Sequence, residues 1–205
     1  MGRPSNTAQR KQEIVFALLK VMSELGYEKA SIQAIAREAG LASGLIHYHF
    51  KTKQEILISA VGWIVSAAEE RLTSMQEGQQ NPWDRLEAFI NARLATGETQ
   101  MPEIVSAWVV IAAESIRQQE VRDIYQDLVK TQLEMLSALL LEVWEGKSKV
   151  DEEVSHLSAI IVAAIEGAFQ LSVTAPQAMP KNYSADTVIK LVKSRISAAS
   201  INAMS

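Results

Sequence analysis

The positions of the prolines and of the apolar residues constrain the fold of this chain most. All five prolines stand at expected boundaries, and between them apolar residues recur at three- and four-residue steps, which is typical of amphipathic helices. No stretch alternates apolar and polar residues in the manner of a strand. At 205 residues the chain can bury a sizeable core. The sequence therefore predicts an all-α fold of about nine helices.

Capping residues and glycines set the expected helix limits. Ser31, Thr52 and Ser184 stand where a hydroxyl can cap a first turn, and Gly40 and Gly146 stand where a helix ends. The expected helices cover approximately residues 7–25, 32–39, 42–50, 53–76, 82–96, 102–118, 120–144, 151–174 and 184–198. The helix at 102–118 is apolar around most of its girth, so we expect it to be buried on several sides.

The stretch 31–53 is predicted to form two short helices joined by a tight turn. Small Ala36 permits the two helices to cross closely, and Gly40 makes the bend between them. The apolar faces that meet are Ile32, Ile35, Ala36 and Ala39 on the first helix and Leu45, Ile46 and Phe50 on the second. This is the arrangement of a helix-turn-helix, whose second helix enters the DNA major groove.

Charge is unevenly distributed along the chain. The whole chain carries a net charge of −4, which alone argues against nucleic-acid binding. Residues 1–54 hold eight basic and four acidic side chains, a net of +4, whereas the remainder holds 12 basic and 20 acidic ones. A basic first quarter favours a DNA-contacting head, although chance clustering of solvated charges would give the same count.

The composition also limits where the chain can act. No cysteine is present, which excludes disulfides and thiolate metal sites and is compatible with a reducing cytoplasm. We expect no apolar run to reach the roughly 20 residues of a membrane span. The basic N-terminus leads into an amphipathic helix instead of a secretion signal. The sequence therefore predicts a cytoplasmic protein with no membrane partner.

The first 60 or so residues resemble the TetR family of one-component transcriptional regulators. The matching segments are IVFALLKVMSELGYEKASIQAIAREAG, then Gly44, HYHF (47–50) and KTKQEIL (51–57). In the later helices, Ala107-Trp108 and Ile165-Glu166-Gly167 are similar to the BetI-like, choline-responsive subgroup. The resemblance implies a helix-turn-helix DNA-binding domain at 1–52, with the motif at about 31–50, and a ligand-binding and dimerisation domain at 53–205.

The resemblance also implies a mechanism and a set of DNA contacts. A homodimer would bind a pseudo-palindromic double-stranded operator, usually blocking transcription, and a small-molecule effector would release it. Gly44 would permit close approach to the DNA backbone, Tyr48 would contact a base or phosphate, and His49 and Lys53 would grip phosphates. The full set is Ser31, Gln33, Arg37, Ser43, Gly44, His47, Tyr48, His49, Lys51 and Lys53.

Two residues depart from the family pattern. Ala42 stands where Ser or Thr is common, so this position offers neither a hydroxyl cap for the helix nor a hydroxyl for a phosphate. His47 stands where Tyr is common, which keeps a planar donor but changes its reach. Both departures put individual contacts in doubt and leave the fold expectation unchanged.

The effector site is sought among unusual residues on otherwise apolar helices. A lone carboxylate such as Glu166 is costly to bury unless it meets a donor, water or a ligand. Beside an aromatic ring it would suit a cationic or hydrogen-bonding effector, whereas the alternative is that it faces solvent or a dimer interface. The candidate effector residues are Trp63, Trp108, Glu114, Glu166 and Phe169.

A homodimer interface is expected on the last two helices. Their apolar stripes would form a symmetric four-helix interface, although an intramolecular core would account for part of each stripe. These stripes comprise Leu157, Ile161, Ala164, Ile165 and Ala168, then Val188, Leu191, Val192 and Ile196.

Catalytic and metal motifs do not stand out in the sequence. No nucleophile elbow, phosphate-cradling glycine loop or His-Glu-x-x-His pair occurs, so we predict no enzyme and no cofactor. His47 and His49 are two residues apart on a helix and point to different sides, so we predict no metal site there. A helical dimer that binds small molecules or proteins but not DNA stays open as the alternative function, and an enzyme with scattered active-site residues is a third.

Overall fold

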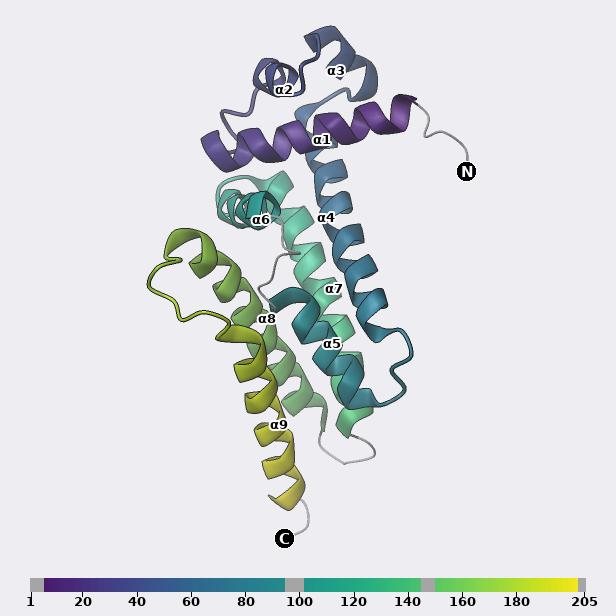
Figure 1. Ribbon diagram of the computed structural model, residues 1–205, viewed down its shortest axis with the longest axis vertical. Helices are drawn as coiled ribbons and strands as arrows, with labels where there is room; N and C mark the ends of the chain where they lie inside the picture. The colour runs from purple at the N-terminus through teal and green to yellow at the C-terminus, as the bar shows by residue number, and fades with distance from the viewer. Residues whose placement is uncertain (1–5, 95–101, 145–149, 203–205) are drawn as a thin grey trace. The chain divides into compact units, whose positions relative to one another are not determined.

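The computed structural model describes residues 6–94, 102–144 and 150–202, and every regular element within those ranges is an α-helix. The all-α prediction is therefore confirmed. The helices are α1 Asn6–Leu25, α2 Ile32–Glu38, α3 Ser43–His49, α4 Lys53–Gln76, α5 Pro82–Leu94, α6 Pro102–Glu114, α7 Gln119–Trp144, α8 Val150–Thr174 and α9 Ser184–Asn202 (Figure 1). The expected helix ends at Thr96 and Gly146 lie outside the described residues.

The chain divides into two compact units. The head unit comprises Met1–Ala67 and Gln100–Tyr125, and the body unit comprises Ala68–Thr99 and Gln126–Ser205. Both α4 and α7 contribute residues to each unit. The head unit thus includes α6 as well as the helix-turn-helix, while the functional division between residues 52 and 53 stays a prediction.

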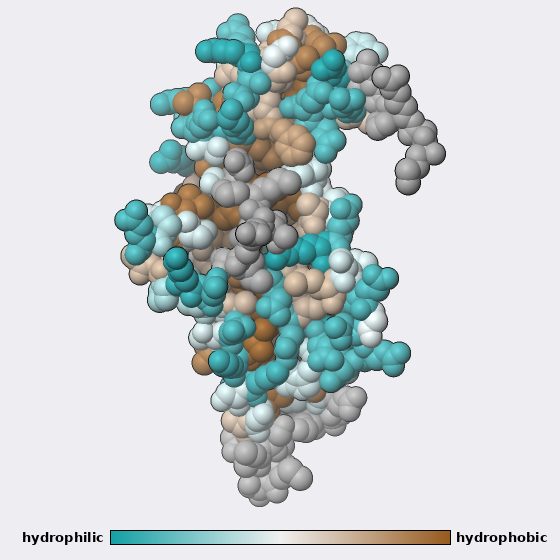
Figure 2. Space-filling view, viewed as in Figure 1, coloured by the Kyte–Doolittle hydropathy of each residue, from teal (hydrophilic) through white to brown (hydrophobic). Residues whose placement is uncertain are grey.

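In the head unit α1 packs against α2 and α3 on one side and against α6 on the other (Figure 1). Its apolar stripe is buried, with Ile14, Leu18 and Met22 each 0% exposed. An ion pair between Lys20 and Glu38, 2.6 Å long, also joins α1 to α2. Hydrophilic side chains cover much of the face of these helices seen in Figure 2.

In the body unit α5, α8 and α9 pack against one another. Their apolar faces share a core with residues from the end of α4 and the later part of α7, including Leu72, Phe89, Leu140, Ile165 and Val192. Ion pairs of Lys193 with Glu87 and of Arg195 with Glu153 tie α9 to α5 and α8. The body unit is thus a helical bundle built by burial of helix faces.

Local signals set most helix starts as the sequence predicts. The Ser31 hydroxyl accepts a hydrogen bond from the amide of Ala34, 3.1 Å away, and that of Thr52 accepts one from Glu55, also at 3.1 Å. Ala42, at the start of α3, makes no side-chain cap, as expected. Ser184 begins α9, but its hydroxyl donates to the Leu94 carbonyl at the end of α5, 3.1 Å away. That use of Ser184 joins two helices and was not predicted.

The predicted end of the 102–118 helix is wrong by one turn, because α6 ends at Glu114. The Arg122 guanidinium reaches back from α7 and donates to the carbonyls of Ser115 and Ile116, at 2.9 and 2.6 Å. These bonds satisfy carbonyls that a longer helix would have paired internally. A side chain beyond the helix therefore sets its end.

The expectation that no apolar run is long enough to span a membrane is also wrong. Glu152–Thr174 in α8 is long and apolar enough by length and composition alone, with a mean hydropathy of 1.7. Charged residues such as Glu166 interrupt the run in the sequence without lowering its mean hydropathy much. Because α8 packs against α5 and α9, this stretch contributes to the core of the body unit.

Candidate nucleic-acid interface and effector region

A rigid two-helix platform presents the predicted DNA contacts. Gly40 turns the chain between α2 and α3 with a φ of +66°, a conformation that side chains with a Cβ rarely adopt. Ile35 and Ile46 are fully buried between the helices, and Phe50 is 4% exposed. The buried faces therefore fix which side of α3 points outward.

Most of the predicted DNA contacts lie at the surface of this platform. Tyr48 is 77% exposed, and its ring meets that of His49 edge to face, with centroids 5.0 Å apart. The exposed members of the set are Ser31, Gln33, Arg37, Gly44, His47, Tyr48 and Lys51, and the half-buried ones are Ser43, His49 and Lys53. The arrangement offers aromatic, imidazole and cationic groups from one helix pair and the residues that follow it.

Gly44 lies in the first turn of α3. A Cβ placed on Gly44 would meet no protein atom within 4 Å. Nothing inside the described protein therefore requires glycine at this position, so any requirement for it comes from a partner that approaches the backbone.

Lys51 and Lys53 differ in their surroundings. Lys51 is exposed, and its backbone amide donates to the Glu55 carboxylate, 2.7 Å away. The Lys53 ammonium instead donates to the Tyr27 carbonyl at 2.7 Å and lies 4.0 Å from the centroid of the Tyr27 ring. Burial lowers the pKa of Lys53, and the charges of Glu114 and Glu28 oppose that change. The two lysines are therefore not equivalent as phosphate ligands.

The candidate effector residues are divided between the units. Trp63 packs edge to face on Phe16 in the head unit, with centroids 4.6 Å apart. Trp108, 6% exposed, lies 5.5 Å from the Tyr125 ring, and half-buried Glu114 accepts a hydrogen bond from Gln118 at 3.1 Å. In the body unit, Glu166 is half-buried on α8, and Phe169 packs against the core.

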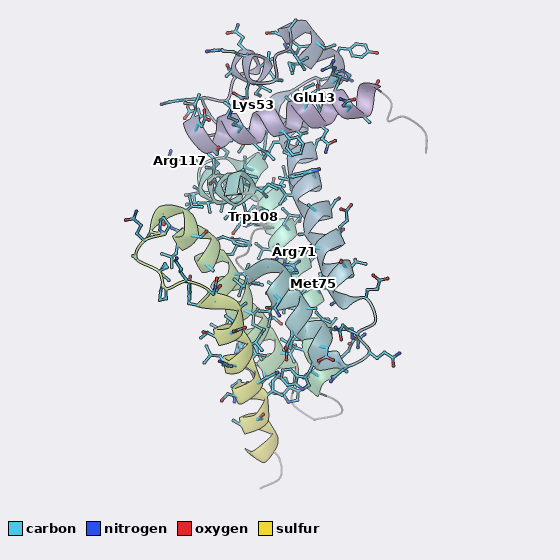
Figure 3. The ribbon with its side chains drawn as sticks, in the orientation of Figure 1. Glu13, Lys53, Arg71, Met75, Trp108 and Arg117 are labelled. Atoms are coloured by element: carbon cyan, nitrogen blue, oxygen red, sulfur yellow. The ribbon has the colours of Figure 1, made fainter. Side chains whose placement is uncertain are left out.

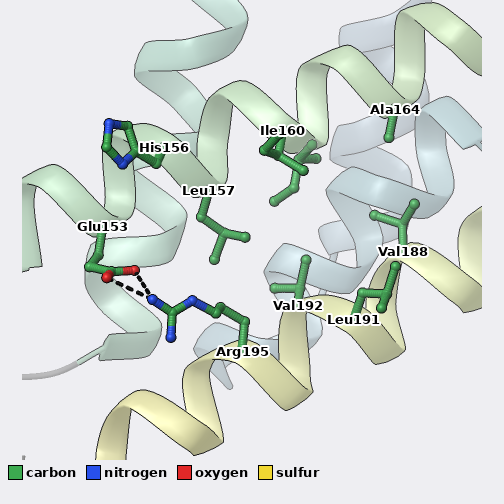
Figure 4. Close-up of a pocket in the computed structure, with 10 residues that line it drawn as sticks. Glu153, His156, Leu157, Ile160, Ala164, Val188, Leu191, Val192 and Arg195 are labelled. Carbon is green, nitrogen blue, oxygen red and sulfur yellow. Dashed lines mark hydrogen bonds and ion pairs between the residues drawn. The ribbon is translucent and has the colours of Figure 1, made fainter.

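A groove of about 470 Å³ lies between α8 and α9 in the body unit (Figure 4). Its floor and walls are mostly apolar, with Ile160 66% and Leu191 64% exposed. Arg195 spans one end and bonds both carboxylate oxygens of Glu153, at 2.6 and 2.5 Å. None of the five candidate effector residues lines it. The predicted stripes supplied several of its walls, but Ile160 and the ion pair were not foreseen.

Arg93 is a buried charge that the sequence did not single out. Its guanidinium lies 3.8 Å from the centroid of the Phe89 ring, and the residue is 9% exposed. Burial lowers its pKa to about 10, and the charge of Glu69 opposes that change. No sequence pattern marks it, because Arg93 occupies the last turn of α5, where a solvated base would be ordinary.

Within the described ranges no three His, Asp or Glu side chains gather closely enough to hold a metal ion. His47 and His49 are on α3 in the head unit, whereas His156 lines the α8–α9 groove. The described histidines therefore do not form a shared site.

Two family descriptions match the chain. Residues 14–60 match bacterial regulatory proteins of the tetR family, and residues 82–199 match the C-terminal part of BetI-type transcriptional repressors. The two matches correspond to the helix-turn-helix region and to the helices from α5 to α9.

Curated relatives match over part of their length. The transcriptional regulator BetI of Rhizobium meliloti is 27% identical over 113 residues, which cover 55% of each chain. The regulator HbdR of an Aromatoleum species is 31% identical over 105 residues, which cover 51% of this chain and 46% of HbdR. The chain thus spans about half the length of the curated relatives it matches.

Solved structures share the fold over nearly the whole chain. A transcriptional regulator from Saccharomonospora viridis in complex with choline has a TM-score of 0.72 at 22% identity, covering 93% of this chain and 96% of that one. A regulator from Pseudomonas aeruginosa PAO1 has a TM-score of 0.77 at 18% identity, covering 97% and 96%. At these identities the likeness concerns the fold.

Proposed function

The chain belongs to the TetR family of bacterial regulatory proteins, and on that premise we propose that it is a ligand-responsive DNA-binding repressor acting as a homodimer. The observation that carries the proposal is the exposed outer face of α3, with Tyr48 77% exposed above a buried helix-turn-helix core. A polar, partly basic helix face on a rigid support is what major-groove reading needs.

The direct test is a mobility-shift titration against the DNA that flanks the gene of this protein. We expect retardation at low salt that weakens steeply as salt rises, because phosphate contacts release counterions. Tyr48→Ala should raise the operator Kd about tenfold or more, as removal of a base or phosphate contact does. Tyr48→Phe removes the hydroxyl and keeps the ring, so it separates the contributions of these two groups to operator affinity. Absence of any shift at low salt would favour the helical module that does not bind DNA.

The proposed effector carries a cationic head group, with choline as the first probe. Support comes from the BetI-type C-terminal match, from the choline complex of the S. viridis regulator and from Glu166, a half-buried carboxylate on an apolar helix. Choline should cause the protein to dissociate from its operator. The uncharged isostere of choline, which has carbon in place of nitrogen, should not. Glu166→Gln should blunt this response and leave DNA affinity without choline unchanged. Equal release by both compounds would contradict a cation site.

The proposed dimer uses the α8–α9 face. Only 22% of the most apolar window of α8 is buried within one chain, and Ile160 and Leu191 stand exposed beside the groove. A second copy covering this face would remove that apolar surface from water, which is the main source of dimer stability. Operators with two half-sites require such a symmetric pair of helix-turn-helix regions.

As a regulator of a bacterial chromosome, the protein is proposed to act in the cytoplasm and to have no catalytic activity of its own. The curated relatives it matches are named as transcriptional regulators, which supports this part of the proposal. Incubation of the purified protein with choline should leave the choline chemically unchanged, as followed by proton NMR.

A further inference from the structure

The side chain of Lys53, which is labelled in Figure 3, is held by the turn that follows α1. Its ammonium donates to the Tyr27 carbonyl at 2.7 Å and reaches the Glu28 carbonyl at 3.4 Å. The same ammonium lies 4.0 Å from the centroid of the Tyr27 ring, within cation–π range. Lys53 is the first residue of α4, so these contacts join the start of α4 to the turn that follows α1.

Holding a half-buried ammonium there requires compensation for its reduced solvation. Backbone carbonyls and a ring face provide part of this stabilisation, and nearby negative charge provides a further part. Glu114, the last residue of α6, lies next to this turn, because a Cβ placed on Gly26 would be 3.6 Å from its carboxylate oxygen. Gly26 itself has a φ of +80°, and this left-handed conformation turns the chain just before Tyr27.

The end of α6, which carries Glu114, and the turn that follows it form an acidic corner that is held in place by hydrogen bonds. Gln118 donates to the Glu114 carboxylate at 3.1 Å, and Arg122 ties the turn after α6 to α7 through two carbonyls. Tyr27, whose ring meets the Lys53 ammonium, is 4% exposed, and burial, then the charges of Glu120 and Glu114, raise its pKa. The buried ring that meets the ammonium therefore also lies within electrostatic range of Glu114, whose carboxylate is held by a hydrogen bond.

We propose that Lys53 is a positioning residue that seats α4 and the recognition helix on the α1 turn instead of contacting DNA, and that Glu114 on α6 stabilises this seat electrostatically. The proposal rests on the proposed function, because it concerns how operator affinity is set. It removes Lys53 from the predicted phosphate ligands and Glu114 from the predicted effector ligands, and it links α6 to the helix-turn-helix through the charge of Glu114.

The salt dependence of operator binding distinguishes a seat from a phosphate ligand. Removing one phosphate ligand from a protein bound to B-DNA lowers the slope of log K against log salt by about 0.9, hence by about 1.8 for two protomers. Lys53→Met should raise the operator Kd about tenfold at unchanged slope. Lys51→Met, the matched control on an exposed neighbour, should lower the slope by about 1.8. A slope reduced by Lys53→Met would overturn the proposal.

A double-mutant cycle tests the role of Glu114. Glu114→Gln should raise the operator Kd about threefold in the wild-type background and leave it unchanged in Lys53→Met, because the charge it stabilises is gone. Glu114→Asp should restore most of the affinity. Glu120→Gln removes a charge from the same corner that influences Tyr27, and it should leave the Kd unchanged. Additive effects of Glu114→Gln and Lys53→Met would also overturn the proposal.

The failures of the two proposals can be told apart. If wild-type protein does not bind operator DNA, the proposed function fails. If wild type binds and Lys53→Met has a reduced slope, or the cycle is additive, only the seat fails. Each variant is compared well below its own thermal unfolding midpoint, so that a folding defect is not read as a change in affinity.

Discussion

At the scale of single residues, a substitution at Gly44 can distinguish the requirements of folding from those of the proposed DNA binding. A Cβ at Gly44 meets no protein atom within 4 Å, so Gly44→Ala should stabilise α3 by up to about 1 kcal/mol through lower backbone entropy in the unfolded chain. If the DNA backbone approaches Gly44 closely, the same change should raise the operator Kd several-fold. Thermal unfolding and a mobility-shift titration measure the two effects.

Gly62→Ala is the matched control, since Gly62 is an exposed glycine in α4 whose Cβ would also meet nothing. It should gain stability without changing the operator Kd. A Gly44→Ala protein with unaltered affinity would show that DNA does not come close to this part of α3.

Arg93 makes a prediction about stability. Its pKa of about 10 lies below the ordinary value for arginine, so the folded protein holds this proton less tightly than the unfolded chain does. Burial of the charge therefore costs stability at neutral pH, and the cost falls as pH rises above about 10. Arg93→Met, which keeps an apolar stem on Phe89, removes this titrating group, so its free energy of unfolding in urea should lack the rise above about pH 10 that Arg93 gives the wild type.

Arg85→Met on the same helix is the comparison for Arg93. Arg85 pairs with Glu142 near the surface, and such pairs contribute at most about 1 kcal/mol, so its removal should be neutral or slightly destabilising. If Arg93→Met is destabilising, hydrogen bonds of the guanidinium outweigh its desolvation.

At the scale of helices, the two caps of the helix-turn-helix give opposite predictions. Ser31→Ala removes an existing cap from α2 and should cost about 1 kcal/mol, whereas Ala42→Ser adds one to α3 and should gain about 0.5–1 kcal/mol. Hydrogen exchange of the amides in each first turn localises the changes. Equal protection of the α3 amides in wild type and Ala42→Ser would mean that the new hydroxyl does not reach them.

Helix starts and ends could be predicted where the residues that determine them are local. The Ser31 and Thr52 caps act within three residues, so sequence reasoning placed α2 and α4 well. The end of α6 depends on Arg122, and Ser184 bonds a residue 90 positions earlier, so neither is visible in a local pattern. The seat of Lys53 on Tyr27, 26 positions earlier, was missed for the same reason.

At the scale of the whole molecule, the family match and the fold agree, but the effector site is the least predictable feature. Apolar helices provide many aromatic and carboxylate candidates with the same periodicity, and only packing distinguishes them. Trp63 and Trp108 each meet an aromatic ring, and Phe169 joins the body core, which is also how ordinary core residues behave. Glu166 is the candidate for which a ligand role has the clearest chemical reason, because a carboxylate there interrupts an apolar helix.

The proposed dimer is the property on which the proposed operator recognition depends most. Leu191 is 64% exposed beside the α8–α9 groove, so Leu191→Glu should place a charge inside the proposed interface and give monomers in sedimentation at micromolar concentration. Ile116→Glu changes an isoleucine that is 75% exposed but lies in the head unit, and it should remain dimeric. An operator with two half-sites is bound tightly only when the two DNA-binding regions are joined in a dimer. Leu191→Glu should therefore lose operator affinity over the same protein concentrations at which it dissociates. If Leu191→Glu stays dimeric and binds the operator as the wild type does, the interface lies elsewhere. If it stays dimeric but binds the operator more weakly, the α8–α9 face sets the spacing of the two DNA-binding regions and does not hold the subunits together.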